Sequence, residues 1–305
     1  MLKAFDWVFV SRPIVLIPAW AFLLAGYLRA NERAAESSPP IGPLLAPFLL
    51  LTAVLAGVYI VNQIFDRETD KENGKLFLLA EGHVSARGAW IEAVVLIGGG
   101  LASAAAFRPG LLPWLVSSAV LGLLYSAPPA RFKARPFVDV AANAIGYGAI
   151  TFLVGFSLAG EIGREEIARA IPYVLLVGAV FLHTALVDQE GDRKAGMWTT
   201  AIALGDRATS VAALALLAGA GLVGFRLGEP YVPPAALGAA PFFLWGALVP
   251  GRKGSTLAYQ WGSLLFVLLL VIRQPLFGLF LVLLVAATRL YYRFRFRLVY
   301  PRLDF

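Results

Sequence analysis

Long apolar runs alternate with short polar segments along most of this chain. A helix that crosses a bilayer needs about 20 mostly apolar residues. Reading for such runs predicts ten candidate spans, at 13–28, 43–64, 89–106, 111–128, 137–160, 170–187, 207–227, 232–249, 255–272 and 275–291. Only Ile272-Arg273-Gln274-Pro275 separates the last two runs, which therefore also fit one broken element. The pattern predicts an all-α, polytopic bundle of nine to ten transmembrane helices.

Composition supports lipid as the main solvent of the chain. Of the 305 residues, 59% are hydrophobic and 15% are charged, and the mean hydropathy is +0.75. A soluble domain of this size needs more charge to cover its surface. The absence of cysteine excludes disulfides, thiolate metal sites and cysteine nucleophiles. No soluble domain fits between the spans, so we expect residues 1–305 to form a single transmembrane domain.

The charge distribution predicts the orientation. The formal charge of +7 is typical of membrane topology and lipid headgroups, and nothing in the pattern indicates nucleic acid. With a cytoplasmic N-terminus and ten spans, 19 of the 26 lysines and arginines fall in cytoplasmic segments and 7 in external ones. This bias predicts a cell-membrane protein with segments 65–88, 129–136 and 188–206 in the cytoplasm. Residues 1–12 resemble an amphipathic lead lying at the interface through Phe5, Trp7 and Phe9.

Two acidic motifs stand at predicted cytoplasmic ends of spans. Asn62, Asp66 and Asp70 are spaced i, i+4, i+8, and Asp188 and Asp192 are spaced i, i+4, so each set lies on one helix face. Like charges at this spacing repel, and acids at a membrane boundary call for a partner. Hard oxygen ligands favour Mg²⁺, which completes its shell with water and substrate phosphate. The two motifs therefore predict a magnesium-dependent diphosphate site. The alternative is two solvated helix ends, neutralised by neighbouring basic residues.

A third block, LLYSAPPARFK, lies between the acidic motifs. Pro128-Pro129 ends the preceding span, because proline cannot continue the helical hydrogen-bond ladder. Tyr125 lies one turn inside the membrane and Lys133 just outside it. A lysine there can bind phosphate as a point charge, although ordinary snorkelling at a membrane boundary also accounts for it.

Together these blocks resemble the UbiA superfamily of intramembrane prenyltransferases. NQIFDRETD is similar to the first family motif, NxxxDxxxD, and DQEGDRKAG followed by TTAIALG is similar to the second, DxxxDxxxG. YSAPPARFK is similar to a segment common in the branch with chlorophyll synthases and archaeal ether-lipid prenyltransferases. Arg12-Pro13 in the first span also fits. The resemblance implies a helical bundle, usually of nine spans, around a central cavity open to the lipid, with the active site on the cytoplasmic side.

The resemblance also implies roles for individual residues. Members bind prenyl diphosphate through Mg²⁺ held by both motifs. In this chain the metal ligands would be Asn62, Asp66, Asp70, Asp188 and Asp192. The residues expected near the diphosphate or the substrate are Lys133, Tyr125, Arg193, Lys194 and Arg12. Within span 137–160, Asn143 and Tyr147 are one turn apart and fit either cavity residues or interhelical hydrogen bonds.

Departures from the family pattern bear on the acceptor. Many members have Asn-Asp where this chain has Asn62-Gln63, and Arg-Pro where it has Phe77-Leu78. A familiar quinone precursor is therefore not implied. Asp139 is expected to cap its span or to orient Lys133, and a buried, satisfied imidazole is favoured over a catalytic base for His183.

The sequence thus predicts an enzyme that transfers a prenyl group from a prenyl diphosphate, with Mg²⁺, to an aromatic or lipophilic acceptor in the membrane. The main alternative is a cation-coupled transporter. That class predicts acids and broken helices near the bilayer midplane, whereas these acids stand at one predicted surface.

Overall fold

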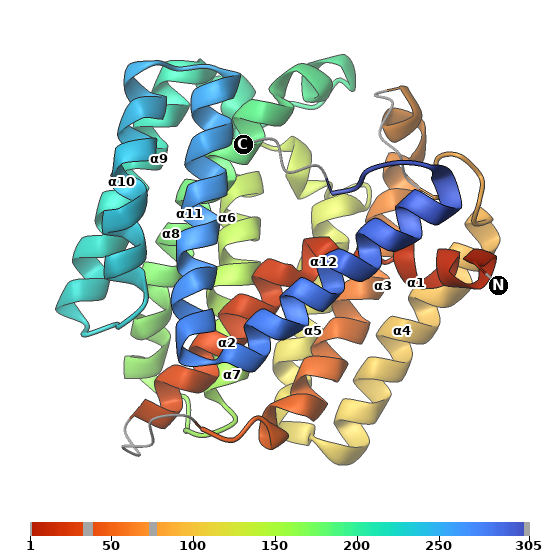
Figure 1. Ribbon diagram of the computed structural model, residues 1–305, viewed down its shortest axis with the longest axis horizontal. Coiled ribbons are helices and arrows are strands. Elements are labelled where there is room, and N and C mark those ends of the chain that lie inside the picture. The colour runs from red at the N-terminus through yellow and green to blue at the C-terminus, as the bar shows by residue number, and fades with distance from the viewer. Residues whose placement is uncertain (1, 33–38, 73–77, 302–305) are drawn as a thin grey trace. The chain divides into compact units, whose positions relative to one another are not determined.

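All regular structure in the described part of this computed structural model is helical (Figure 1). The structure describes residues 2–32, 39–72 and 78–301, and the side chains of 68–72 lie outside that description. Contacts divide the chain into two units, each of which is described by itself. Unit 1 comprises Met1–Ile17, Phe48–Ala127 and Gln274–Phe305, and unit 2 comprises Pro18–Pro47 and Pro128–Arg273. The expectation of one domain over residues 1–305 stays a prediction.

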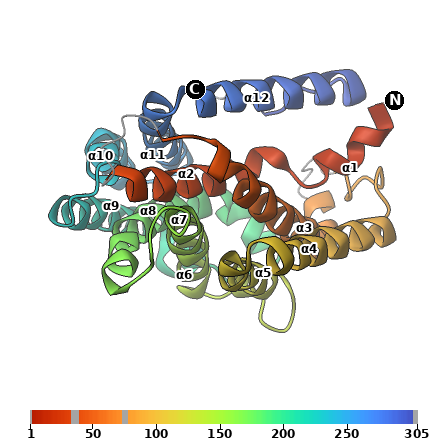
Figure 2. The same cartoon turned by 90° about the horizontal axis from the view of Figure 1, so that it is seen from below.

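Unit 1 holds the N-terminal segment, three long helices and the last helix. Its elements are η1 (Leu2–Phe5), α1 (Asp6–Phe9), η2 (Pro13–Leu16), α3 (Gly42–Glu72, from Phe48 onward), α4 (Ala86–Phe107), η4 (Pro109–Leu111), α5 (Leu112–Ser126) and α12 (Pro275–Phe296). Helices α3, α4 and α5 lie side by side (Figure 2). Gly57 of α3 abuts Ala93 and Ile97 of α4, and Gly122 of α5 abuts Val58 of α3.

Unit 2 holds the remaining helices. Its elements are α2 (Ile17–Asn31), η5 (Phe132–Ala134), α6 (Val138–Ala144), a π-helix η6 (Ile145–Thr151), α7 (Phe152–Phe156), α8 (Arg164–Lys194), α9 (Thr200–Arg226), α10 (Val232–Leu248) and α11 (Arg252–Arg273). Helices α8, α9, α10 and α11 pack side by side (Figure 1). Elements α6, η6 and α7 continue one another and pack on α8.

Nine helices of the described residues are long and apolar enough to cross a membrane. This agrees with the predicted nine to ten spans of an integral, multi-pass membrane protein. The predicted run 232–249 forms the shorter apolar helix α10, of 17 residues, which stops where Pro250 and Gly251 follow. The runs 255–272 and 275–291 are two separate helices rather than one broken element, because Pro275 starts α12 at its first position.

Contacts of the N-terminal segment differ from the predicted interfacial lead. Phe5 and Trp7 are exposed, as expected, but Phe9 is buried and stacks on Tyr291 of α12, with ring centroids 3.9 Å apart. Asp6 is 3% exposed and accepts hydrogen bonds from Tyr291 and from both Nε and Nη2 of Arg295. Arg295, in the last turn of α12, therefore forms an ion pair with this buried carboxylate.

Two glycines let α2 and α7 cross at backbone contact. A Cβ atom added to Gly26 would lie 1.9 Å from the carbonyl oxygen of Phe152, and one added to Gly155 would lie 1.8 Å from that of Leu23. Small residues permit this approach between membrane helices. The crossing fixes α2 against the helix that carries the π-turn.

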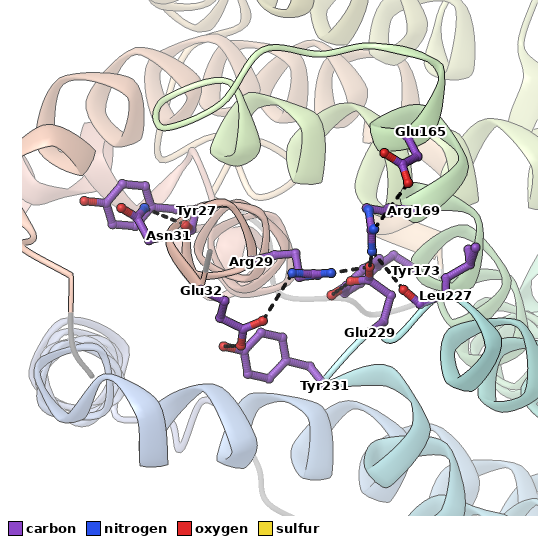
Figure 3. Close-up of polar contacts among 10 residues, drawn as sticks. All are labelled: Tyr27, Arg29, Asn31, Glu32, Glu165, Arg169, Tyr173, Leu227, Glu229 and Tyr231. Carbon is purple, nitrogen blue, oxygen red and sulfur yellow. Dashed lines mark hydrogen bonds and ion pairs between the residues drawn. The ribbon is translucent and has the colours of Figure 1, made fainter. Parts of the chain in front are cut away.

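A buried ionic cluster in unit 2 joins α2, α8 and the turn between α9 and α10 (Figure 3). The side chain of Glu229, in the α9–α10 turn, has no exposed surface and accepts hydrogen bonds from Arg29 of α2, Arg169 of α8 and Tyr173 of α8. Tyr231 donates to Glu32, and burial together with that carboxylate raises the pKa of the Tyr231 hydroxyl. The cluster lies at the start of α8, at the opposite end of this helix from Asp188 and Asp192.

Candidate active site

The first acidic motif lies on the last turns of α3, in unit 1. Asn62 donates a hydrogen bond from Nδ2 to Oγ of Ser126, at 2.8 Å, and Ser126 is 1% exposed. Asn62 and Asp66 are both partly buried. Asp70 lies in the same helix, but its side chain is outside the described residues. The structure therefore brings the first motif and the end of α5, where half-buried Tyr125 lies, to one place within unit 1.

Helix α3 also holds the segment that contains Arg12. Gln63, 2% exposed, donates from Nε2 to the carbonyl oxygen of Val10, at 2.5 Å, and Tyr59 donates to that of Val15. Between these two bonds Arg12 adopts a left-handed conformation, with φ 55°, and lines a small hollow with Tyr292. The amide of Gln63 can donate to a carbonyl, whereas an ionised aspartate cannot. Gln63, which stands where many family members have aspartate, therefore helps to hold the segment that contains Arg12.

The second acidic motif lies on the last turns of α8, in unit 2. Asp188 is exposed and Asp192 is half-buried. Arg193 and Lys194 are exposed in the last turn of α8. Their positive charges interact favourably with the negative C-terminal end of the helix dipole. Gln189, between the acids, donates from Nε2 to the carbonyl oxygen of Ala201 in α9, at 2.9 Å. This bond ties the end of α8 to the start of α9.

Lys133 lies in a constrained loop of unit 2. Its side chain is 8% exposed, which is unusual for a lysine. Arg131 and Phe137, on either side of it, have φ of 38° and 67°, a region that residues other than glycine rarely adopt. Asp139, expected to cap its span or to orient Lys133, accepts a local bond from Val140 and also binds Thr200 at the start of α9.

The remaining predicted residues lie in the helix that follows this loop. Asn143 is in α6 and Tyr147 is in the π-helix η6, both half-buried and one turn apart. Thr151 donates to the carbonyl oxygen of Tyr147. Single π-turns within α-helices are frequent at functional sites. Hydrophobic periodicity gives no signal for this irregularity.

His183 departs from the sequence expectation. It is fully buried, with its ring edge-on to Phe243 at 4.8 Å, as expected for an imidazole in the core. Neither ring nitrogen, however, has a hydrogen-bond partner among the described residues. The imidazole is therefore buried as expected, but no described residue satisfies its ring nitrogens.

The acidic residues fit Mg²⁺ by their donor chemistry. Among the described side chains no group of three or more His, Cys, Asp or Glu residues could hold a metal. Each motif offers carboxylates at one helix end, and Mg²⁺ is commonly bound by one or two carboxylates plus phosphate and water. Both Asp188 and Asp192 have surface available to a ligand, as has Asp66.

Two polar contacts were not expected from sequence. Ser126 and Thr200 each bind a singled-out residue, Asn62 and Asp139 respectively. Ser126 lies in the motif block YSAPP, and Thr200 lies in the motif block TTAIALG. Their place in these blocks was the signal in the sequence that could have pointed to them. Their partners lie more than sixty positions away, so spacing alone gives no pairing.

Comparison with known proteins points to one family. The model of the UbiA prenyltransferase family matches residues 15–255. The chain is 30% identical to a lycopene elongase/hydratase of Haloferax volcanii over 273 residues, covering 84% of this chain and 79% of that protein. It is 29% identical to a digeranylgeranylglyceryl phosphate synthase of Methanoculleus marisnigri over 217 residues, covering 69% of this chain and 72% of that protein.

A solved structure shares the fold. The structure of a UbiA homologue from Archaeoglobus fulgidus, bound to GPP and Mg²⁺, matches with a TM-score of 0.62 and 24% identity. The match covers 86% of this chain and 97% of that one. At this identity the likeness concerns the helical fold alone.

Proposed function

This chain belongs to the UbiA prenyltransferase family, and on that premise we propose that it uses Mg²⁺ to transfer a prenyl group from a prenyl diphosphate to a long, uncharged isoprenoid such as lycopene. The observation that carries the proposal is the 30% identity to a lycopene elongase/hydratase over 84% of the chain. The family match disfavours the cation-coupled transporter, since members are prenyltransferases.

We assign donor binding to the two acidic motifs. Asp66, Asp70, Asp188 and Asp192, with Asn62, would hold the metal and the diphosphate. Bound Mg²⁺ supplies Lewis-acid stabilisation of the charge that develops on the departing diphosphate. Lys133, buried in a constrained loop, adds a fixed positive charge at the same step. Tyr125, Arg193, Lys194 and Arg12 are assigned to the substrate, as are Asn143 and Tyr147.

The segment around Leu78 supports an uncharged acceptor. Where many family members have Arg-Pro, this chain has Phe77-Leu78. Leu78, Leu79 and Ala80 are 3%, 1% and 6% exposed, and the two leucines belong to an apolar cluster with Phe9. A cationic anchor for a carboxylate or phosphate acceptor is therefore absent from described residues 78–80, and a hydrocarbon has no need of one.

Prenyl transfer to a hydrocarbon breaks one carbon–oxygen bond and forms one carbon–carbon bond. The allylic carbon–oxygen bond breaks and diphosphate leaves with the bonding electrons. A terminal double bond of the acceptor attacks the allylic carbon, forming a carbon–carbon bond and a tertiary cation. That cation either loses a proton or takes up water and then loses one. The second course would correspond to the hydratase activity in the name of the Haloferax relative.

The test is an assay of the purified protein in lipid nanodiscs with radiolabelled dimethylallyl, geranyl, farnesyl and geranylgeranyl diphosphates. Lycopene, geranylgeranylglyceryl phosphate and an aromatic carboxylic acid are offered as acceptors, with Mg²⁺ or with EDTA. We expect label to move to lycopene only with Mg²⁺. Label on either other acceptor alone would refute the hydrocarbon acceptor. No transfer and no diphosphate release from any donor would refute the Mg²⁺-dependent reaction in this chain.

A further inference from the structure

We propose that Asp139 and Thr200 form a clasp that positions the Lys133 loop, residues 128–137, against the end of α8 that carries Asp188 and Asp192. The proposal rests on the proposed function and assigns two positioning residues to it. All of these residues belong to unit 2.

The clasp consists of three hydrogen bonds between the start of α6 and the start of α9, together with one bond within α6. The carboxylate of Asp139, 1% exposed, accepts from the backbone N–H of Thr200 at 2.8 Å and from the Thr200 hydroxyl. It also accepts from the backbone N–H of Val140, at 2.8 Å. The Thr200 hydroxyl oxygen in turn accepts from the backbone N–H of Phe137, at 2.6 Å. Thr200 is 2% exposed, so water competes little for these bonds.

The positions of these groups explain how a carboxylate can be buried here. Asp139 lies in the first turn of α6, and its side chain binds the first residue of α9. The first N–H groups of a helix have no partner within it, and the N-terminus carries a partial positive charge. Two helix N-termini therefore stabilise one carboxylate. Thr199, the residue that precedes α9, makes no side-chain cap, so Asp139 caps α9 from another helix.

On one side the clasp holds the Lys133 loop in a costly conformation. Phe137, with φ 67°, is the residue whose N–H binds Thr200. Such backbone conformations are unfavourable and persist only when the surroundings impose them. Arg135 adds a bond to the carbonyl oxygen of Pro129, and its own carbonyl accepts from Asp139 N–H. The loop that buries Lys133 is thus fixed at its C-terminal end by Thr200.

On the other side the clasp holds the second acidic motif. Only residues 195–199 separate the end of α8 from Thr200. Within that connection the N–H of Met197 donates to the carbonyl oxygen of Asp192, at 2.9 Å. Gln189 binds Ala201, the residue after Thr200. Thr200 therefore connects the cationic loop to the acidic helix end, and neither Asp139 nor Thr200 needs to touch substrate.

The experiment compares Asp139→Asn, Thr200→Val and Thr200→Ser with wild type, and uses Asp206→Asn, an exposed acid on the same helix α9, as the matched control. Thr200→Ser keeps the hydroxyl, and Thr200→Val removes it at nearly constant shape. Hydrogen–deuterium exchange of peptides that cover 131–140 and 196–203 reports on the clasp without any activity. Kinetics report on positioning, through kcat, the KM for the prenyl diphosphate and the Mg²⁺ concentration at half-maximal rate.

We expect Asp139→Asn and Thr200→Val to speed exchange in both peptides about tenfold or more. We also expect kcat to fall ~10- to 100-fold with a raised Mg²⁺ requirement, since a misplacement of about 1 Å can cost ~10²-fold in rate. Thr200→Ser and Asp206→Asn should resemble wild type in both measurements. Wild-type behaviour of Thr200→Ser would show that the effect of Thr200→Val comes from loss of the hydroxyl and not from a change in side-chain volume.

Unchanged exchange in Thr200→Val and Asp139→Asn would refute the clasp. If these two variants exchange faster but keep wild-type kinetics per folded molecule, the hydrogen bonds are purely structural. That result would refute the proposal that Asp139 and Thr200 position the site. If wild-type protein neither transfers prenyl groups nor binds inorganic pyrophosphate with Mg²⁺, the proposed function fails and positioning fails with it. The exchange data would still decide whether the clasp exists.

Discussion

At the residue scale, Gly155 allows the tightest backbone approach in unit 2. A Cβ atom there would lie 1.8 Å from the carbonyl oxygen of Leu23, and backbone cannot move away as a side chain can. We expect Gly155→Ala to cost about 1–3 kcal/mol of stability, as overpacking does. Gly98→Ala is the control, because a Cβ on Gly98 in α4 meets no atom within 4 Å and alanine favours a helix by ~0.5–1 kcal/mol. Thermal unfolding in nanodiscs that leaves both variants equally stable would contradict the crossing.

Gln63 carries a second prediction at this scale. Its buried amide donates to the carbonyl oxygen of Val10, so Gln63→Glu would place a carboxylate against a carbonyl with no proton to share. We expect the free energy of unfolding to fall by more than about 3 kcal/mol, because a buried charge is left without a hydrogen-bond partner. Gln63→Met, which removes the bond without adding charge, should cost less, about 1–3 kcal/mol. The reverse order in denaturant titrations would contradict the assigned hydrogen bond.

At the element scale, Glu229 joins the α9–α10 turn to α2 and α8 (Figure 3). Glu229→Gln would leave the guanidinium groups of Arg29 and Arg169 without their buried counter-charge. Breaking a buried pair on one side costs about 3–5 kcal/mol. Glu165→Gln removes a partner of Arg169 that is 73% exposed and should cost no more than about 1 kcal/mol. Equal unfolding midpoints for the two variants would show that the buried cluster does not hold this end of unit 2 together.

The elements themselves were largely predictable, because span length and apolar composition are local properties. Pro128-Pro129 ends α5 and Pro275 starts α12, as proline chemistry requires. The cluster at Glu229 was not predictable, since Arg29 and Glu229 are 200 positions apart and a charged residue in a loop gives no partner. The π-turn at Tyr147 and the left-handed Phe137 were also hidden, because packing and tertiary bonds impose them.

For the candidate site, the sequence predicted which residue types lie near the helix ends. It did not predict the hydrogen bonds that hold these residues in place. Asp66 and Asp192 lie in the last turns of α3 and α8, where the apolar runs of the sequence end. The sequence predicts that Asp139 caps its span or orients Lys133, whereas its bonds to Thr200 depend on how α6 and α9 pack. The metal ligand set stays a prediction, as does the cytoplasmic side of both motifs.

At the scale of the whole molecule, we propose that acids from two distant parts of the chain act on one diphosphate. Groups that act as a unit have non-additive effects when removed together. Both Asp66 and Asp192 are only partly buried, so replacing either with asparagine should leave the protein folded.

The most direct measurement is a double-mutant cycle of kcat/KM for Mg²⁺-dependent prenyl transfer with Asp66→Asn, Asp192→Asn and both changes together. We expect kcat/KM to fall about 10²- to 10³-fold in each single variant, as for loss of one electrostatic contact to the reacting group. We expect little further loss of kcat/KM in the double variant. Losses that multiply, or either single variant with wild-type turnover, would contradict the claim.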